Sequence, residues 1–134
     1  GAFLNGAKIK ASETTELSRS LLCCDLGYVD EKAGYALDLI RSLWPDMYSV
    51  RFMGSSGLGL AYATAGRVDL YFHHSLMPWD LATGLVLAQE AGARVVDRQG
   101  NQGALFTPSV IVSSPLLVEE FLRATNGQPW RTAG

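Results

Sequence analysis

Apolar residues recur at helical spacing in residues 30–44, DEKAGYALDLIRSLW. Tyr35, Leu39 and Leu43 follow one another at four-residue intervals, which places them on one face of an amphipathic helix. The Asp at the first position can cap the start of this helix, and Pro45 stops the pattern.

A second long segment, PWDLATGLVLAQEAGARVVDRQG, predicts a helix, a strand and a tight turn. Pro78 suits the first helical position, where a missing N–H costs nothing, and Gly92 is a suitable C-terminal stop. Asp80 then lies in the first turn, where the helix dipole favours a carboxylate. This structural reason explains the acid without any function, and the alternative is a ligand whose position the helix fixes.

The remaining pattern alternates shorter strands and helices. We expect strands over residues 16–24, 48–53, 68–72, 93–97 and 109–114, and helices over residues 56–65 and 115–124. Such alternation is typical of a layered α/β domain. We find no repeat and no linker, so we expect a single domain over residues 1–134, with a frayed polar tail over residues 126–134.

Composition excludes several classes of protein. The 134 residues are 48% hydrophobic and 18% charged, so the chain can bury a core. A net charge of −2 and the lack of a long apolar run predict no nucleic-acid partner and no membrane partner. Cys23 and Cys24 are adjacent and poorly placed to bridge, so we expect small buried side chains and a cytoplasmic location.

The start of the chain, GAFLNG, looks like a strand and turn already in progress. It suggests a piece cut from a longer polypeptide, with an expression scar as the alternative.

Two short segments are candidates for chemistry. In RFMGSSGLGLA, small residues at the mouth of a helix leave backbone N–H groups open to an anion, although close packing on a sheet is the favoured interpretation. The segment matches neither a P-loop nor a dinucleotide fingerprint. His73 and His74 follow a strand, and neighbouring side chains of a strand project to opposite sides. We therefore expect one histidine to line a cleft and the other to face solvent, and Asp25 to be a turn former.

Three stretches together resemble the C-terminal half of the inositol monophosphatase family: GAFLNGAKIKAS, RFMGSSGLGLAYATAGRVDLYF and PWDLATGLVLAQEAGARVVD. The resemblance covers nearly the whole chain, and its specific part is the W-D-x-A-x-G…E-A-G segment. It implies one mixed β-sheet flanked by helices, the C-terminal half of an α-β-α-β-α sandwich. It also implies a Mg²⁺-dependent phosphomonoesterase that acts on a sugar phosphate.

The resemblance assigns roles to individual positions. Asp80 would ligate the second catalytic Mg²⁺ and help position the substrate. Gly54, Ser55 and Ser56 would contact the substrate, and His73 stands where inositol-type members often carry an acid that contacts a sugar hydroxyl.

The sequence also departs from the family's pattern. His73 makes inositol phosphate a doubtful substrate, Tyr28 replaces a small hydroxyl residue, and Ala93 replaces a second Gly. The motif D-P-[IL]-D-G-[ST] is missing from these residues.

Asp80 alone supplies neither a first metal nor a base. We therefore expect an enzyme fragment that is inactive alone, and that pairs with an N-terminal half or companion chain or forms a homo-oligomer. The alternatives are a catalytically inactive interaction module and a nucleotide site at residues 54–59.

Overall fold

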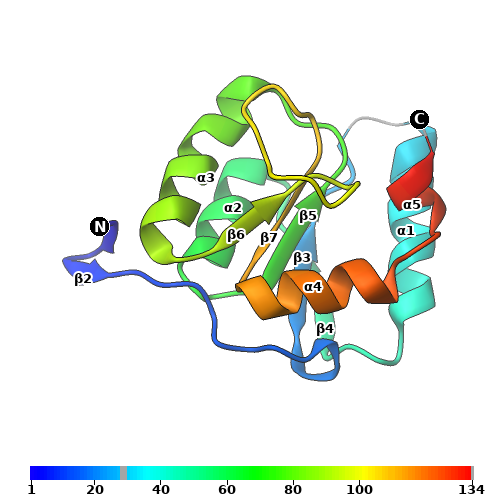
Figure 1. Ribbon diagram of the computed structural model, residues 1–134, viewed down its shortest axis with the longest axis horizontal. Helices are drawn as coiled ribbons and strands as arrows, with labels where there is room; N and C mark the ends of the chain where they lie inside the picture. Colours follow the sequence, from blue (N-terminus) through cyan, green and yellow to red (C-terminus); the bar gives the residue numbers. More distant parts are fainter. Residues whose placement is uncertain (28–29, 134) are drawn as a thin grey trace.

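Three parallel strands lie side by side within a five-stranded mixed sheet in the computed structural model of the chain, which describes residues 1–27 and 30–133 (Figure 1). The strand order is β4-β3-β5-β7-β6, where β3, β4 and β5 are parallel and β7 is antiparallel to both of its neighbours. The bounds are β3 (Leu21–Cys24), β4 (Ser49–Phe52), β5 (Leu70–His73), β6 (Arg94–Val96) and β7 (Val110–Ser113).

Helices cover both faces of this sheet. On one face lie α1 (Glu31–Leu43) and α4 (Pro115–Ala124), whose buried side chains share a core with Leu22 and Cys24. On the other face lie α2 (Ser56–Thr64) and α3 (Pro78–Ala91), which pack with Cys23 and with each other. The prediction of a mixed sheet flanked by helices is therefore confirmed.

Cys23 and Cys24 point into opposite cores, as the alternation of a strand requires. Both are free and fully buried, and burial raises the pKa of the Cys23 thiol to about 12. They act as small apolar side chains, as the sequence predicted.

The ends of the helices follow their capping residues. The Asp30 carboxylate accepts a hydrogen bond from the Ala33 N–H at 3.1 Å, and so caps α1. Pro78 opens α3, and Gly92 ends it with φ +74°. The last long helix, α4, begins at Pro115 and ends at Ala124, as the sequence predicted.

The N-terminal segment forms a small hairpin apart from the sheet (Figure 1). β1 (Phe3–Leu4) pairs with β2 (Ala7–Lys8) across Asn5 and Gly6, whose positive φ angles suit a two-residue turn. The strand predicted over residues 16–24 is shorter than expected, because residues 17–19 form a 3₁₀ helix, η1 (Leu17–Arg19). Within the described residues, no helix is both long enough and apolar enough to cross a bilayer.

The C-terminal segment differs from the frayed tail that its polarity predicted. A short helix, α5 (Pro129–Thr132), places Trp130 fully inside the core, edge-on to Phe72 with ring centroids 5.2 Å apart. Arg131 donates hydrogen bonds to the carbonyl of Leu122 and to the Thr125 hydroxyl. Burial of Trp130 and the hydrogen bonds of Arg131 therefore hold this segment on the core, although most residues around them are polar.

We expect Trp130→Ala to lower the free energy of unfolding by about 3–5 kcal/mol, because it leaves a large cavity beside Phe72. The matched control is Trp79→Ala, since Trp79 is 75% exposed and its loss should cost under about 0.5 kcal/mol. Urea unfolding of both variants measures the difference, and equal midpoints would contradict the assignment of Trp130 to the core.

Candidate functional site

The carboxyl ends of β3, β4 and β5 meet at one edge of the sheet. Cys24 stands opposite both Phe52 and Phe72, so the three strands end at the same level. The chain leaves β3 through α1 to reach β4 on one side, and then passes through α2 to reach β5 on the other. The carboxyl end of β3 is therefore the switch point, where open α/β sheets bind their ligands.

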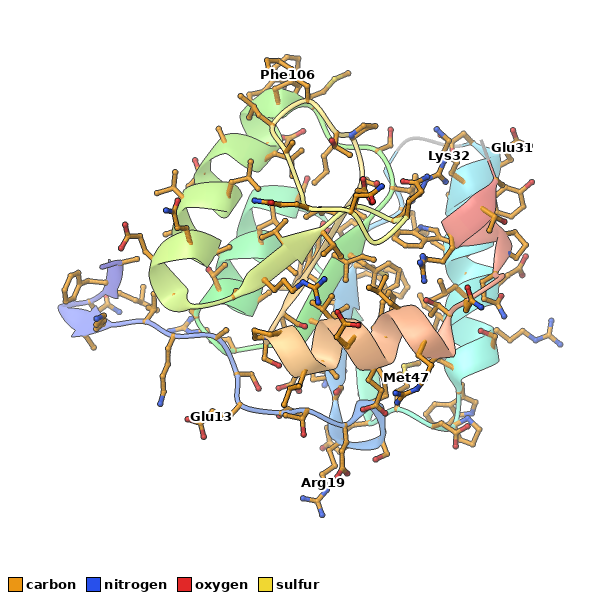
Figure 2. The ribbon with its side chains drawn as sticks, viewed as in Figure 1. Glu13, Arg19, Glu31, Lys32, Met47 and Phe106 are labelled. Atoms are coloured by element: carbon orange, nitrogen blue, oxygen red, sulfur yellow. The ribbon has the colours of Figure 1, made fainter. Side chains whose placement is uncertain are left out.

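The labelled side chains in Figure 2 show at which end of the molecule the carboxyl ends of these strands lie. Glu31 and Lys32 at the start of α1 lie toward the same end of the molecule as Phe106, whereas Glu13 and Arg19 mark the opposite end. The first turn of α3 also lies at the Phe106 end (Figure 1). The residues that follow the parallel strands are thus gathered with the N-terminus of α3.

Asp80 caps the helix on which it lies. Its Oδ2 accepts a hydrogen bond from the Met77 N–H at 3.1 Å, and the side chain is half-buried. This cap uses Oδ2, so Oδ1 is the oxygen that can face a ligand. The structural interpretation of Asp80 is correct, and the geometry remains compatible with a ligand role.

The segment Gly54–Ser56 forms the entry to α2. Gly54 has φ +73°, a conformation that favours glycine, and its N–H donates to Asp25 Oδ1 at 2.6 Å. The Ser55 hydroxyl oxygen accepts from the Leu58 N–H at 3.3 Å and caps the helix. The N–H groups of Ser56 and Gly57 have no carbonyl partner within the helix because they belong to its first turn. These two N–H groups, rather than that of Gly54, are therefore open to an anion.

The two histidines are not arranged as the sequence predicted. His73 and His74 are both buried, at 3% and 2% exposure, and their rings stack with centroids 4.9 Å apart. β5 ends at His73, so the alternation of a strand no longer holds at His74. The expectation that one histidine faces solvent was wrong.

Burial and the neighbouring ring of His74 lower the pKa of His73 to about 4. The carboxylates of Asp25, Asp80 and Asp30 act in the opposite direction, so all three acids lie within electrostatic reach of this ring. His73 Nδ1 accepts a hydrogen bond from the Ser75 N–H at 2.9 Å. A neutral ring that accepts at Nδ1 carries its proton on Nε2, so Nε2 is a donor.

His74 lies deeper in the same cluster. Its side chain is fully buried, and its Nε2 lies 4.0 Å from the carboxylate of Asp30. Burial lowers the pKa of His74, and the positive charges of Lys32 and Arg98 add to that effect. His74 is therefore neutral near pH 7 and supports the stacked ring of His73.

Asp25 is a residue whose role the sequence did not reveal. Its Oδ1 accepts a hydrogen bond from the Gly54 N–H, and its Oδ2 accepts one from the Tyr71 hydroxyl at 3.0 Å. It was predicted to be a turn former, yet it links the end of β3 to Tyr71 of β5 and to the entry to α2. An acid directly after a buried strand that enters a glycine turn was the available signal.

The residues of this edge fit part of a Mg²⁺ site. The free carboxylate oxygen of Asp80 is of the hard type that Mg²⁺ prefers, whereas both oxygens of Asp25 already accept hydrogen bonds. However, within residues 1–27 and 30–133 we find no group of three or more His, Cys, Asp or Glu side chains placed to hold a metal ion. Tyr28, the departure noted at a substrate position, lies outside the described residues.

The comparisons with known proteins agree on one family. The sequence profile of the Inositol monophosphatase family matches residues 1–128. A fructose-1,6-bisphosphatase/inositol-1-monophosphatase of Thermotoga maritima is 32% identical over 126 residues, which are 94% of this chain and 47% of that protein. The Nus factor SuhB of Escherichia coli K12 is 34% identical over 125 residues, 91% of this chain and 46% of that protein.

Solved structures show the same relationship. The extragenic suppressor protein SuhB of Bartonella henselae superposes with a TM-score of 0.86 at 26% identity, covering 95% of this chain and 50% of that one. An IMPase of Thermotoga maritima gives a TM-score of 0.83 at 33% identity, covering 94% of this chain and 48% of that one. The chain thus spans about half the length of the relatives it matches.

We expect the stability of the chain to fall between pH 6.5 and pH 4. The folded state lowers the pKa of His73 from 6.5 to about 4, so within this window the unfolded state binds more protons. Above pH 6.5, His73 makes its full contribution to the free energy of unfolding. This contribution disappears as the pH falls toward 4, a loss on the order of 3 kcal/mol. Urea unfolding at pH 7 and pH 5 measures the part of this loss above pH 5, about 2 kcal/mol. His73→Asn, which keeps an acceptor near Nδ1, should flatten the dependence, and an unchanged slope would contradict the assignment.

Proposed function

The chain belongs to the inositol monophosphatase family, and we propose that it supplies the C-terminal half of a Mg²⁺-dependent phosphomonoesterase acting on a sugar or inositol phosphate. The observation that carries the proposal is the gathering of Asp80, the entry to α2 and His73 at one edge of the sheet. In the proposal, Asp80 is a metal ligand, and Gly54, Ser55, Ser56 and His73 contact the substrate.

A hydrogen bond at the start of α3 fixes the side chain of Asp80. Because Oδ2 holds the Met77 N–H, the carboxylate is fixed on the first turn of α3 with Oδ1 left for a cation. A bound Mg²⁺ would supply neutralisation of the phosphate charge and an activated water. One carboxylate cannot complete such a coordination shell, so the proposal requires further ligands from an N-terminal half.

The entry to α2 is suited to the phosphate. The N–H groups of Ser56 and Gly57 lie at the positive end of the helix dipole, and an anion there would be stabilised by both. The side chain of Ser55 already caps the helix, so its contribution to a substrate would be limited to its remaining hydrogen-bonding capacity.

His73 bears on the choice of substrate. A carboxylate at this position accepts hydrogen bonds from sugar hydroxyls, whereas His73 Nε2 donates one, because Nδ1 is the acceptor for Ser75. A substrate therefore has to offer an oxygen acceptor here. This reversal of polarity supports a sugar phosphate other than inositol monophosphate.

The proposed partner is an N-terminal half, on the same polypeptide or on a companion chain. Around the site edge, several large apolar side chains are exposed, among them Leu58, Met77 and Trp79. A partner half would remove them from water, and a homo-oligomer would serve the same purpose in its absence. The free, buried Cys23 and Cys24 support a cytoplasmic location.

We expect the 134-residue chain alone to release no phosphate from sugar phosphates in the presence of Mg²⁺. Joining it to an N-terminal half of the family should give Mg²⁺-dependent turnover, because the carboxylates of the two halves then face one cleft. In the joined protein, Asp80→Asn should lower kcat by about a hundredfold or more, which is the scale for losing one preorganised charge contact. Phosphate release measures each case.

Two controls accompany this assay. Asn also caps helices, so Asp80→Asn should leave the unfolding midpoint close to that of the parent protein. Robust Mg²⁺-dependent turnover by the isolated chain, unaffected by Asp80→Asn, would refute the half-site. A joined protein that folds and shows no turnover on any sugar phosphate would favour the interaction module.

We expect the joined protein to show no preference for inositol monophosphate over other sugar phosphates. His73→Gln offers an amide oxygen that can accept a hydroxyl, so it should raise kcat/KM for inositol monophosphate relative to glycerol 2-phosphate roughly two- to tenfold. Steady-state kinetics on the two substrates measure this ratio. Selective hydrolysis of inositol monophosphate by the unsubstituted protein would exclude the role given to His73.

A further inference from the structure

Both oxygens of the Asp25 carboxylate are engaged, and their donors come from different parts of the site. Oδ1 accepts from the Gly54 N–H at 2.6 Å, and Oδ2 accepts from the Tyr71 hydroxyl at 3.0 Å. Asp25 itself follows the last residue of β3. One side chain therefore joins the end of β3 to β5 and to the loop between β4 and α2.

Tyr71 is a rigid support for this contact. Its side chain is fully buried, and α2 crosses its ring at Gly59. A Cβ at Gly59 would lie 2.2 Å from the ring, so only glycine allows the helix to approach so closely. The ring is fixed between the helix and the sheet, and this fixes the position of its hydroxyl.

Gly54 is the least restrained residue of the set. It is exposed, has φ +73°, and an added Cβ there would meet no neighbouring atom within 4 Å. Space around Gly54 itself therefore leaves this residue unrestrained, although its neighbour Met53 packs against the core. A charge-assisted hydrogen bond from the Gly54 N–H to Asp25 ties this residue to the end of β3.

We propose that Asp25 is a positioning residue, which anchors the entry to α2 so that the N–H groups of Ser56 and Gly57 face the substrate. The inference rests on the proposed function, because that function assigns a substrate contact to this helix start. Asp25 also occupies the Gly54 N–H, which leaves the N–H groups of Ser56 and Gly57, at the start of α2, as the donors for a substrate. Asp25 acts through Gly54 and does not itself touch the substrate.

Asp69 provides a matched control at the other end of the same strands. Its carboxylate accepts hydrogen bonds from the Leu21 N–H at 2.7 Å and from the Ser12 hydroxyl, and so ties the start of β5 to β3. Like Asp25, Asp69 is a carboxylate that links β3 to β5 through hydrogen bonds. Unlike Asp25, it lies at the opposite end of these strands, away from the first turn of α2. A purely structural role would give both acids the same effect.

The test compares variants of the joined protein in phosphate release. Asp25→Ala should raise KM about tenfold, the effect of losing one charge-assisted hydrogen bond, whereas Asp69→Ala should lower the melting temperature with KM changed less than about twofold. Asp25→Asn should restore most of the lost affinity, since its amide oxygen can accept from Gly54 while its NH₂ donates to Tyr71. Tyr71→Phe keeps the ring under Gly59 and serves where Asp25→Ala fails to fold, with an increase in KM of about threefold expected.

A second readout does not depend on activity. In the ¹⁵N-labelled 134-residue chain, the Gly54 amide proton should resonate downfield and move upfield in Asp25→Ala and Tyr71→Phe, but not in Asp69→Ala. If the joined protein releases no phosphate, the proposed function is wrong. The shift of the Gly54 resonance then still tests whether Asp25 holds the Gly54 N–H. If the protein is active and Asp25→Ala leaves KM unchanged, or Asp69→Ala raises it equally, the positioning role is overturned while the function stands.

Discussion

The hydrogen-bonded register of three parallel strands determines where the candidate site of this molecule lies. β3 pairs with β4 and β5 so that Cys24 stands level with Phe52 and Phe72. The next residues along each strand therefore leave the sheet together, and the two crossovers depart on opposite faces. This places Asp25, the entry to α2 and the histidine pair at one edge of the sheet, although they are up to about fifty residues apart in sequence.

Local helix chemistry then orients the polar groups at this edge. Ser55 satisfies the Leu58 N–H in the first turn of α2, and Asp80 satisfies the N–H of Met77 just before α3, so both would be favoured there in a protein without any catalytic role. The same capping bonds restrict their motion, which is what a ligand or a substrate contact requires. One geometry therefore suits both helix capping and ligand binding at these residues. For this reason, the capping role of Asp80 is no evidence for or against its role as a metal ligand.

Features with a local cause were predictable from the sequence. The ends of α3 and α4 follow from Pro78, Gly92 and Pro115, and the segregation of Cys23 and Cys24 follows from the alternation of a strand. Features that depend on residues far away in the sequence were not predictable. The core position of Trp130 requires a gap beside Phe72, and the stacking of His73 on His74 requires the strand to end between them.

Asp25 shows the same limit within the candidate site. Its carboxylate looked like that of a turn residue, because its partners Gly54 and Tyr71 lie 29 and 46 residues away. The positions assigned by family resemblance were placed at one edge of the sheet, but the bonds that orient them became visible only in three dimensions. The family pattern therefore named positions that lie at one edge of the sheet, and the fold supplied the contacts between them.

The most direct test of a cation site at this edge is paramagnetic line broadening by Mn²⁺, which accepts oxygen ligands as Mg²⁺ does. In the ¹⁵N-labelled joined protein, substoichiometric Mn²⁺ should broaden the amide resonances of Asp80, Gly54 and Ser56 before others of this chain. Asp80→Asn should weaken that effect strongly. Broadening that is unchanged in Asp80→Asn, or that centres on the opposite edge near Asp69, would contradict the placement of the metal at the carboxyl ends of the parallel strands.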